Sequence, residues 1–284
     1  MKLYQYDVGG RRVVAAADGA EQFIVPGVET TLALLAEAGT SAAALTARVR
    51  AAGREPFSRD ATRRLLIPLE PPEVWGFGVT YRKSASDREQ DAPSGGDIYA
   101  RAHAGPRPET FFKATASRCV GPGEAIGIRG DSALTAAEPE LAYVVGLGGA
   151  VVAYTLGNDV SAWDTERDNP LYLPQSKIYA GCCALGPCLV TADEVRPEDV
   201  EITMTIRRDG GTAFQGRAST SLLRWPIAYL HDYLTRYNPV PAGTVAVTGT
   251  GIMTPAGFGL QEGDEVTIAA APFGELVNTA RLLK

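Results

Sequence analysis

The chain has 284 residues, of which 45% are hydrophobic and 21% are charged, and its formal net charge at neutral pH is −6. This composition is that of an ordinary globular protein with enough apolar residues for a substantial core. The net negative charge argues against a nucleic-acid partner, and no apolar run approaches the roughly 20 residues that a membrane-spanning helix needs. Because the N-terminal segment also lacks the long apolar stretch of a secretory signal, we expect a cytoplasmic protein.

The first 70 residues predict a small α/β domain. A Gly-Gly turn joins two predicted strands, and two short predicted helices follow, each with a Thr or Ser cap before it and a glycine near its end. These elements occupy residues 2–8, 11–17, 30–38 and 41–52. The proline-rich residues 68–72 mark the expected boundary, which divides the chain into domains of residues 1–70 and 71–284.

Short apolar segments separated by Gly/Pro turns follow from Val74 onward and predict a mostly β sandwich or roll. The segments cover residues 74–79, 110–114, 142–146, 151–156, 202–207, 245–249 and 265–270. The expected fold class is therefore α+β, mostly β, with the small α/β domain at the N-terminus.

Two segments depart from this strand pattern. Residues 226–237 predict a helix with proline in its first turn and an apolar stripe along one face. His231 lies off that stripe, so we expect it to be solvated. Residues 82–107 are polar and show no apolar period, and a stretch of this length inside a compact domain favours an active-site lid.

Glu138 and Glu140 flank a proline at the start of an apolar run. Two residues apart on a strand, their side chains point the same way, with Cα atoms roughly 6.5 Å apart. Two carboxylates held in parallel repel each other unless a positive charge lies between them, and a hard divalent cation such as Mg²⁺ or Mn²⁺ fits that position. The alternative is a solvated strand start at which both acids face water.

Asp159 follows about twenty residues later, at the polar end of another predicted strand. The intervening residues 146–150 are rich in glycine, but a dinucleotide-binding motif would need a third spaced glycine and a following helix, whereas a strand follows here. We therefore interpret them as a hairpin turn. An antiparallel hairpin would bring Asp159 back toward Glu138 and Glu140, and the three carboxylates would leave coordination sites for water and substrate.

The four cysteines have no spacing typical of a zinc site, and we expect buried thiols in a reducing compartment. They are Cys119, Cys182, Cys183 and Cys188. Because the chain has only two histidines, acid–base chemistry is expected from Lys, Glu, Ser or water.

From Val74 to its C-terminus the chain resembles the fumarylacetoacetate hydrolase superfamily. It is most similar to the branch that contains 2-keto-3-deoxy-D-arabinonate dehydratase, rather than to the C–C bond hydrolases. The resemblance rests on GVTY at 78–81, PETFFKAT at 108–115, EPELA at 138–142, GNDVSAWD at 157–164, NPLYLPQSKIYAGCCALGP at 169–187 and TGTG at 248–251.

This resemblance implies a β-roll catalytic domain, a homodimer or homotetramer, and a site that binds a small-molecule 2-oxo acid. It implies a Mg²⁺ ion (Mn²⁺ is possible) held by Glu138, Glu140 and Asp159. It also implies that Lys177 lies next to the metal and that Thr250 lies against the substrate carboxylate.

The chain departs from the family pattern at two positions. Ser84 stands where the hydrolase branch usually carries a histidine, which weakens a hydrolytic interpretation. Trp163 stands where the family usually has an arginine that helps to hold substrate oxygens. Tryptophan removes a fixed cation and a fork-shaped donor and adds a large aromatic face, so the substrate could be less polar or bulkier than a sugar acid. Ser84 and Trp163 are both candidate substrate-binding residues.

Lys177 is the candidate general base, or the charge that anchors an enolate, although a Schiff-base role and an ordinary surface position are alternatives. Glu109 and Glu166 are candidates for delivering a proton to a leaving hydroxyl, with Glu166 also placed among the substrate-binding residues; salt-bridge or loop roles are the alternatives. Thr250 could donate its hydroxyl and backbone N–H to a carboxylate, or could lie in a simple turn at the end of a strand.

The expected activity is that of a Mg²⁺-dependent hydro-lyase that dehydrates a 2-keto-3-deoxy sugar acid resembling a pentonate. A cation chelated by a 2-oxo acid would stabilise the enolate that forms when C3 loses a proton. Loss of a C4 hydroxyl then gives dehydration, whereas C–C cleavage gives hydrolysis or decarboxylation. An acylpyruvate-type hydrolase, an oxaloacetate-type decarboxylase and a non-catalytic metabolite-binding relative remain alternatives.

Overall fold

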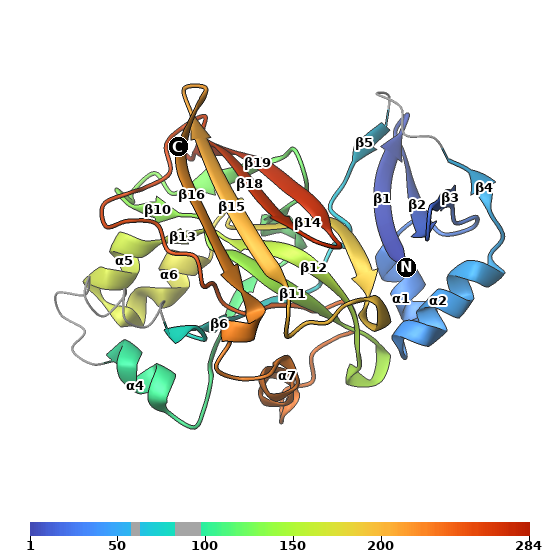
Figure 1. The fold of residues 1–284 in the computed structure, drawn as a ribbon, viewed down its shortest axis with the longest axis horizontal. Coiled ribbons are helices and arrows are strands. Elements are labelled where there is room, and N and C mark those ends of the chain that lie inside the picture. The colour runs from blue at the N-terminus through green and yellow to red at the C-terminus, as the bar shows by residue number, and fades with distance from the viewer. Residues whose placement is uncertain (58–62, 83–97) are drawn as a thin grey trace.

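Two β-sheets face each other, and a pair of short helices covers the outer face of the larger sheet (Figure 1). The structure, a computed structural model, describes residues 1–57, 63–82 and 98–284. Among these residues, no helix combines the length and the apolar character needed to cross a membrane. Strands predominate over helices, which confirms the predicted α+β, mostly β class.

The four predicted N-terminal elements are present as β1 (Lys2–Val8), β2 (Arg11–Asp18), α1 (Thr31–Ala38) and α2 (Ala42–Ala51). The structure adds the short strands β3 (Glu21–Ile24), β4 (Glu55–Pro56) and β5 (Arg63–Leu65), which were not predicted. Both predicted helix caps are present, because the Thr30 hydroxyl accepts a hydrogen bond from the N–H of Ala33 and the Ser41 hydroxyl accepts one from the N–H of Ala44, each at 3.1 Å.

The larger sheet runs through both halves of the chain. Its further strands are β6 (Val74–Gly78), β7 (Glu109–Ala114), β8 (Cys119–Val120), β11 (Pro139–Val145), β12 (Val151–Asp159), β14 (Cys183–Thr191) and β17 (Val245–Val247). In the described residues the strand order is β4-β3-β2-β1-β14-β12-β11-β17-β6-β7, with β5 paired to β1 and β8 paired to β14. The antiparallel β1–β14 pair joins the N-terminal strands to the rest of the sheet. The predicted division at residue 70 stays a prediction.

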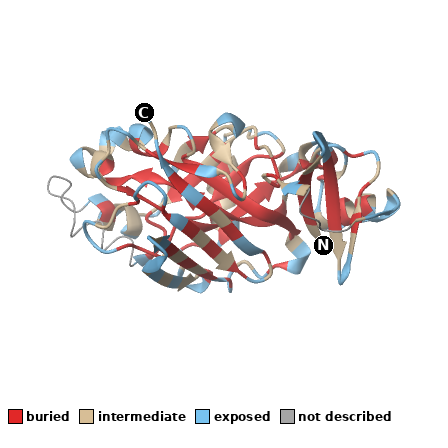
Figure 2. Ribbon diagram, turned by 90° about the horizontal axis from the view of Figure 1, so that it is seen from above, coloured by how far each residue is buried: buried red, intermediate tan, exposed pale blue. Residues whose placement is uncertain are grey.

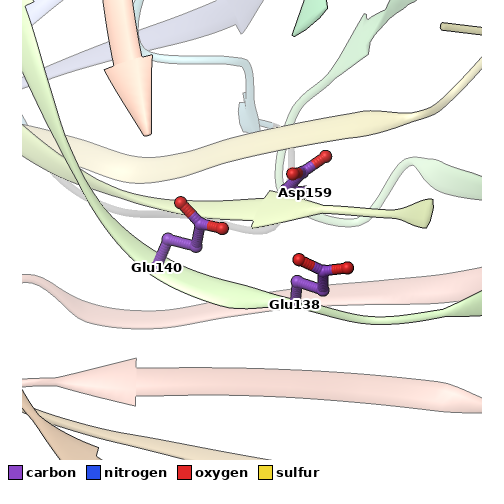
Figure 3. Close-up of side chains that lie close together, drawn as sticks. All are labelled: Glu138, Glu140 and Asp159. Atoms are coloured by element: carbon purple, nitrogen blue, oxygen red, sulfur yellow. The ribbon is translucent and has the colours of Figure 1, made fainter. Parts of the chain in front are cut away.

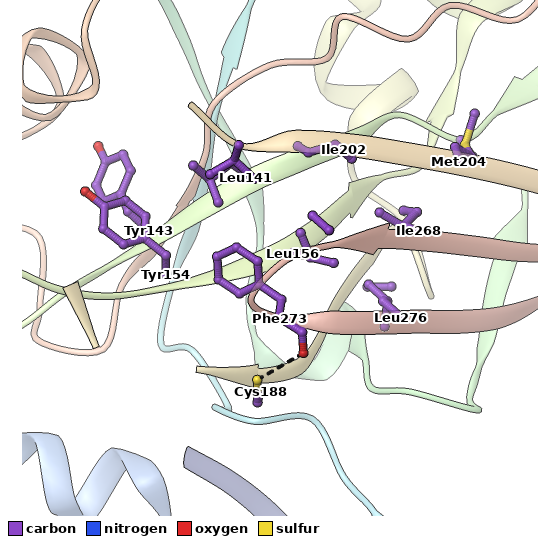
Figure 4. Packing of buried hydrophobic residues seen from close by; sticks show 14 of the residues in the cluster. Leu141, Tyr143, Tyr154, Leu156, Cys188, Ile202, Met204, Ile268, Phe273 and Leu276 are labelled. Atoms are coloured by element: carbon purple, nitrogen blue, oxygen red, sulfur yellow. Dashed lines mark hydrogen bonds between the residues drawn. The ribbon is translucent and has the colours of Figure 1, made fainter. Parts of the chain in front are cut away.

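The second sheet has the order β16-β15-β18-β19-β9. Its strands are β9 (Ala125–Ile128), β15 (Glu201–Arg208), β16 (Gly211–Ser219), β18 (Glu265–Ala270) and β19 (Gly274–Leu282), and a separate pair joins β10 (Thr135–Ala136) to β13 (Ser161–Ala162). Leu141 and Leu156 of the larger sheet lie in one apolar cluster with Ile202 and Ile268 of this sheet (Figure 4). The buried residues between the sheets form the main core (Figure 2).

A second apolar cluster lies on the other face of the larger sheet. Leu34 and Leu35 of α1 and Leu45 and Val49 of α2 are fully buried in it. They pack with apolar side chains of the sheet, among them Val144 of β11. The strands β11 and β12 are therefore buried on both faces, which makes them a rigid support for the polar residues at their ends.

Several strand limits differ from the predictions. The predicted strand 142–146 begins at Pro139, and the predicted strand 151–156 continues to Asp159. Both additions contain polar residues that the apolar pattern could not include. From Val74 onward the strands β8, β9, β10, β13, β14, β16 and β19 were not predicted, and neither were the helices α4 (Ile98–Ala104), α5 (Trp163–Asp168) and α6 (Leu173–Lys177). The predicted glycine-rich turn is confirmed as η2 (Leu147–Gly149) between the antiparallel strands β11 and β12.

The predicted helix after Pro226 is present as α7 (Ile227–Thr235), but the solvated position predicted for His231 is wrong. The His231 ring is half-buried, its Nε2 donates a hydrogen bond to the carbonyl oxygen of Gly149 at 2.7 Å, and it meets the Tyr143 ring edge-on. The reason is that α7 packs against the turn end of the β11–β12 hairpin.

Most of the predicted lid lies outside the described residues, which resume at Ile98. The described part forms α4, which contacts two other segments of the chain. His103 Nδ1 lies 2.8 Å from the carbonyl oxygen of Val79, and the Tyr99 hydroxyl lies 3.4 Å from Glu166 Oε1.

Candidate metal centre and active site

Three carboxylates converge at one end of the β11–β12 hairpin. In this hairpin Glu140 pairs with Gly157, and the N–H of Asp159 donates to the carbonyl oxygen of Glu138 at 2.9 Å. Each of Glu138, Glu140 and Asp159 can offer an oxygen such that all three oxygens lie within 4.8 Å of one another. Figure 3 shows Glu140 on β11, Glu138 at the residue before that strand begins, and Asp159 at the end of β12. The predicted convergence is confirmed.

All three carboxylates are almost completely buried, with exposed fractions of 3% for Glu138 and 1% for both Glu140 and Asp159. The pKa of Glu140 is raised well above its usual value, first by burial and then by the negative charges of Asp159 and Glu138. The positive charge of Lys177 and a hydrogen bond from the N–H of Gly249 oppose this rise. The cluster therefore attracts positive charge.

Lys177 lies among these carboxylates, as predicted. Its Nζ is 2.7 Å from Asp159 Oδ2, 2.7 Å from Ser161 Oγ and 3.2 Å from Glu138 Oε1. The short helix α6 ends at this lysine and presents it to the site. A protonated lysine has three N–H donors, and these three contacts can use all of them.

Lys113 is a second buried lysine at the site that the sequence analysis did not identify. Its side chain is completely buried, and Nζ lies 2.5 Å from Asp159 Oδ1, 2.9 Å from the carbonyl oxygen of Val160 and 2.7 Å from that of Lys177. Burial is the largest single influence on the pKa of Lys113 and lowers it, but Asp159 together with Cys182 and Cys183 outweighs burial, so the net shift is upward. A lysine within the apolar strand Thr-Phe-Phe-Lys-Ala was the available signal.

Trp163 occupies a different place from the one expected for a substrate contact. Its indole N–H donates to Glu138 Oε1 at 2.6 Å, and its ring is buried in a small apolar cluster with Ala136 and Met253. It is not among the described residues that line the cavity beside the carboxylates. A neutral donor therefore orients Glu138.

A cavity adjoins the carboxylate cluster. The polar side chains on its wall are those of Glu109, Glu138, Glu166, Lys177 and Thr250. Apolar side chains complete the wall, from Phe77, Val79, Phe111 and Leu173. The structure thus brings together the predicted Lys177, Glu109, Glu166 and Thr250 around one space.

Thr250 and Glu166 have neighbours that fix their side chains. The Thr250 hydroxyl accepts a hydrogen bond from the N–H of Ile252 at 3.2 Å, so it is held within its own turn. Glu166 is buried on α5 and faces the Tyr99 hydroxyl. Ser84, the remaining predicted substrate contact, lies outside the described residues.

Two glycines allow the backbone to approach the site closely. Gly249 has φ of +93°, donates its N–H to Glu140 Oε2 at 2.5 Å, and leaves no room for a Cβ, which would lie 1.9 Å from the Thr80 hydroxyl. A Cβ on Gly78 would lie 1.9 Å from Glu109 Oε2. Both glycines are therefore needed to seat a carboxylate of the site.

Comparisons with known proteins agree on one family. Residues 73–281 match the family model described as fumarylacetoacetate (FAA) hydrolase C-terminal. The chain is 46% identical over 222 residues to 2-dehydro-3-deoxy-D-arabinonate dehydratase of Saccharolobus solfataricus, covering 77% of this chain and 74% of that protein. It is 45% identical over 218 residues to a probable 2-keto-3-deoxyxylonate dehydratase of Haloferax volcanii, covering 76% and 75%.

A solved structure is similar over the full length of both chains. It is described as 2-keto-3-deoxy-D-arabinonate dehydratase complexed with magnesium and 2,5-dioxopentanoate. Its TM-score to this chain is 0.86 at 36% sequence identity. The similarity thus extends to the N-terminal residues, which the family model does not cover.

We predict that Lys113→Met destabilises the protein by about 3–5 kcal/mol, because it leaves the buried Asp159 carboxylate with one cationic partner fewer. Denaturant unfolding of the metal-free protein measures the change. The matched control is Lys2→Met, since half-buried Lys2 donates to a neutral partner, the carbonyl oxygen of Pro272. Equal stability losses in the two variants would contradict a special role for Lys113.

Proposed function

The chain belongs to the fumarylacetoacetate hydrolase family, and we propose that it is a magnesium-dependent dehydratase of a 2-keto-3-deoxy sugar acid. The single observation that carries the proposal is the buried triad of Glu138, Glu140 and Asp159 beside a cavity lined by Lys177. The names of the two relatives at 45–46% identity and the magnesium complex of the similar solved structure support it.

The residues of the triad fit a hard divalent cation. All three offer carboxylate oxygens, the ligand type that Mg²⁺ prefers, and three protein ligands leave positions for water and substrate. Burial, followed by the negative charges of Asp159 and Glu138, raises the pKa of Glu140, and a bound cation would oppose that rise. Mg²⁺ is the proposed ion, and Mn²⁺ can use the same ligand type.

The substrate class follows from the names of the relatives and from simple stoichiometry. A 2-keto-3-deoxy pentonate that loses one water has the composition of 2,5-dioxopentanoate, the compound named in the similar solved complex. Arabinonate and xylonate of one stereochemical series differ only at C2 and C3. These carbons are a ketone and a methylene in the 2-keto-3-deoxy acid, so both relatives' names fit one compound with a single stereocentre at C4.

When bound, the cation would act as a Lewis acid that eases loss of a proton from C3 of a 2-oxo acid. The chain's own residues then supply the proton transfers. Glu109 and Glu166 are the carboxyl groups on the cavity wall outside the metal triad, and we assign them to accepting the C3 proton and to protonating the departing C4 hydroxyl. The resulting 5-hydroxy-2-oxo-3-enoic acid becomes 2,5-dioxopentanoate when a proton moves from C5 to C3 and the enol that this forms transfers its hydroxyl proton to C4.

Lys177 is assigned as a fixed positive charge that anchors the developing enolate. Its three contacts with Asp159, Ser161 and Glu138 match the donors of a protonated ammonium group, which favours this role over that of a general base. Thr250 is assigned to the substrate carboxylate through its backbone, because its hydroxyl already bonds to the backbone of Ile252. Ser84 stays a prediction, and Trp163 is reassigned from substrate contact to orienting Glu138.

We also propose a homodimer or homotetramer that works in the cytoplasm on a small-molecule 2-oxo acid. The family resemblance supports the assembly, and Leu171 and Leu222 are large apolar side chains with exposed fractions of 85% and 66% that an interface could cover. Light scattering on the purified protein measures the assembly directly.

The proposed activity predicts that the purified protein with Mg²⁺ converts 2-keto-3-deoxy-D-arabinonate into 2,5-dioxopentanoate without losing a carbon atom. Product analysis by mass spectrometry measures this, with acylpyruvates and oxaloacetate as competing substrates. Faster C–C cleavage of an acylpyruvate or decarboxylation of oxaloacetate would reject the dehydratase assignment.

Glu140→Gln, which keeps the shape of the side chain, is expected to fold and to lose at least about 100-fold in turnover because a metal ligand is missing.

Trp163→Phe is predicted to weaken Mg²⁺ binding by roughly 10-fold, because Glu138 loses the donor that orients it. Calorimetric titration of the metal-free protein measures the affinity. Phenylalanine keeps most of the aromatic packing, so the melting temperature serves as the control for folding. An unchanged affinity in a folded variant would show that the indole N–H has no part in orienting the ligand.

A further inference from the structure

Two of the four cysteines face each other across neighbouring strands. All four are free thiols, and Cys183 of β14 pairs in register with Cys119 of β8 in a parallel arrangement. Neighbouring strands lie about 4.7–4.9 Å apart, within the Cα separation of about 4.4–6.8 Å that a disulfide bridge accepts.

Pairing in register places the two side chains on the same face of the sheet. Hydrogen bonding to the Cys119 thiol is the first cause of the raised pKa of Cys183, ahead of burial. The adjacent Cys182 is directed elsewhere, because its thiol donates to the carbonyl oxygen of Lys113 at 3.7 Å. Cys183 is therefore the partner that faces Cys119.

The two cysteines differ in access to solvent. Cys119 is partly exposed, whereas Cys183 is completely buried. Cys119 opens the two-residue strand β8 directly after the 3₁₀ helix η1 (Ala116–Arg118), whose three residues are exposed or partly exposed. A short strand at the end of a turn can move by the small distance that separates a thiol contact from an S–S bond of about 2.05 Å.

We propose that Cys119 and Cys183 form a peroxide-sensitive pair that closes into an intramolecular disulfide. The Cys119 sulfur attacks one oxygen of a hydroperoxide, the O–O bond breaks, and Cys119 becomes a sulfenic acid while the other oxygen leaves as water or an alcohol. The Cys183 sulfur then attacks the sulfenic sulfur, the S–O bond breaks, and the hydroxyl leaves as water with the Cys183 proton. Two thiols are oxidised, one peroxide is reduced, and a dithiol reductant reverses the reaction.

The disulfide would lie one strand from the carboxylate cluster. Cys183 pairs in register with Asp159, and Asp159 is the carboxylate that both buried lysines contact. Drawing β14 toward β8 shifts the backbone partner of Asp159, so oxidation is expected to weaken divalent-cation binding by roughly 10-fold. This consequence rests on the proposed metal role of Asp159, whereas the disulfide itself does not.

The test is to treat the full-length protein with hydrogen peroxide, block the remaining thiols and map the peptides by mass spectrometry. We expect a Cys119–Cys183 linked pair that dithiothreitol abolishes. Cys119→Ser should lack it and Cys188→Ala should retain it, because the Cys188 thiol faces the carbonyl oxygen of Phe273. A Cys119–Cys182 link, or sulfinic acid on Cys119 beside a free Cys183, would overturn the proposal. The peptide map of the wild-type protein detects either outcome.

Calorimetry with Mn²⁺ on the reduced and the fully disulfide-bonded protein then tests the coupling. Weaker binding by the oxidised form supports it, and equal binding overturns it. Failure of the reduced protein to bind Mn²⁺ would overturn the metal role of Asp159, while the disulfide would still be decided by the peptide map.

Discussion

Burial of three carboxylates around one point is the constraint on which the rest of the site depends. Negative charges removed from water repel one another strongly, and such a cluster persists in a folded protein only with positive partners. Lys113 and Lys177 supply two of them, both held to Asp159. With all five groups ionised the cluster keeps one net negative charge, which favours the binding of a divalent cation.

The scaffold explains how so unfavourable a cluster is held in place. The strands β11 and β12 are buried on both faces, so their register is specified over most of their length. Glu138 and Glu140 take one side of β11, and Asp159 lies opposite Glu138. Trp163 and the N–H of Gly249 each add one hydrogen bond to a carboxylate, which fixes two of the three in orientation.

Much of this arrangement could be predicted from the sequence because its geometry is local. The two-residue spacing and one hairpin suffice to bring Glu138, Glu140 and Asp159 together. Lys113 could not be found in that way, since it approaches Asp159 from a strand on the far side of the site, 46 positions earlier in the chain. The role of Trp163 was also missed, because it depends on the direction of one N–H rather than on residue type. The half-buried position of His231 depends on packing between α7 and the hairpin turn.

The proposed chemistry requires a divalent cation bound by Glu138, Glu140 and Asp159. Anomalous diffraction from crystals soaked in Mn²⁺ tests this most directly, since it locates the ion without reference to activity. We expect one strong peak bordered by oxygens of all three carboxylates, at coordination distances slightly longer than the 2.0–2.1 Å typical of the smaller Mg²⁺. A fully occupied ion elsewhere, or no peak between these side chains at saturating Mn²⁺, would contradict it.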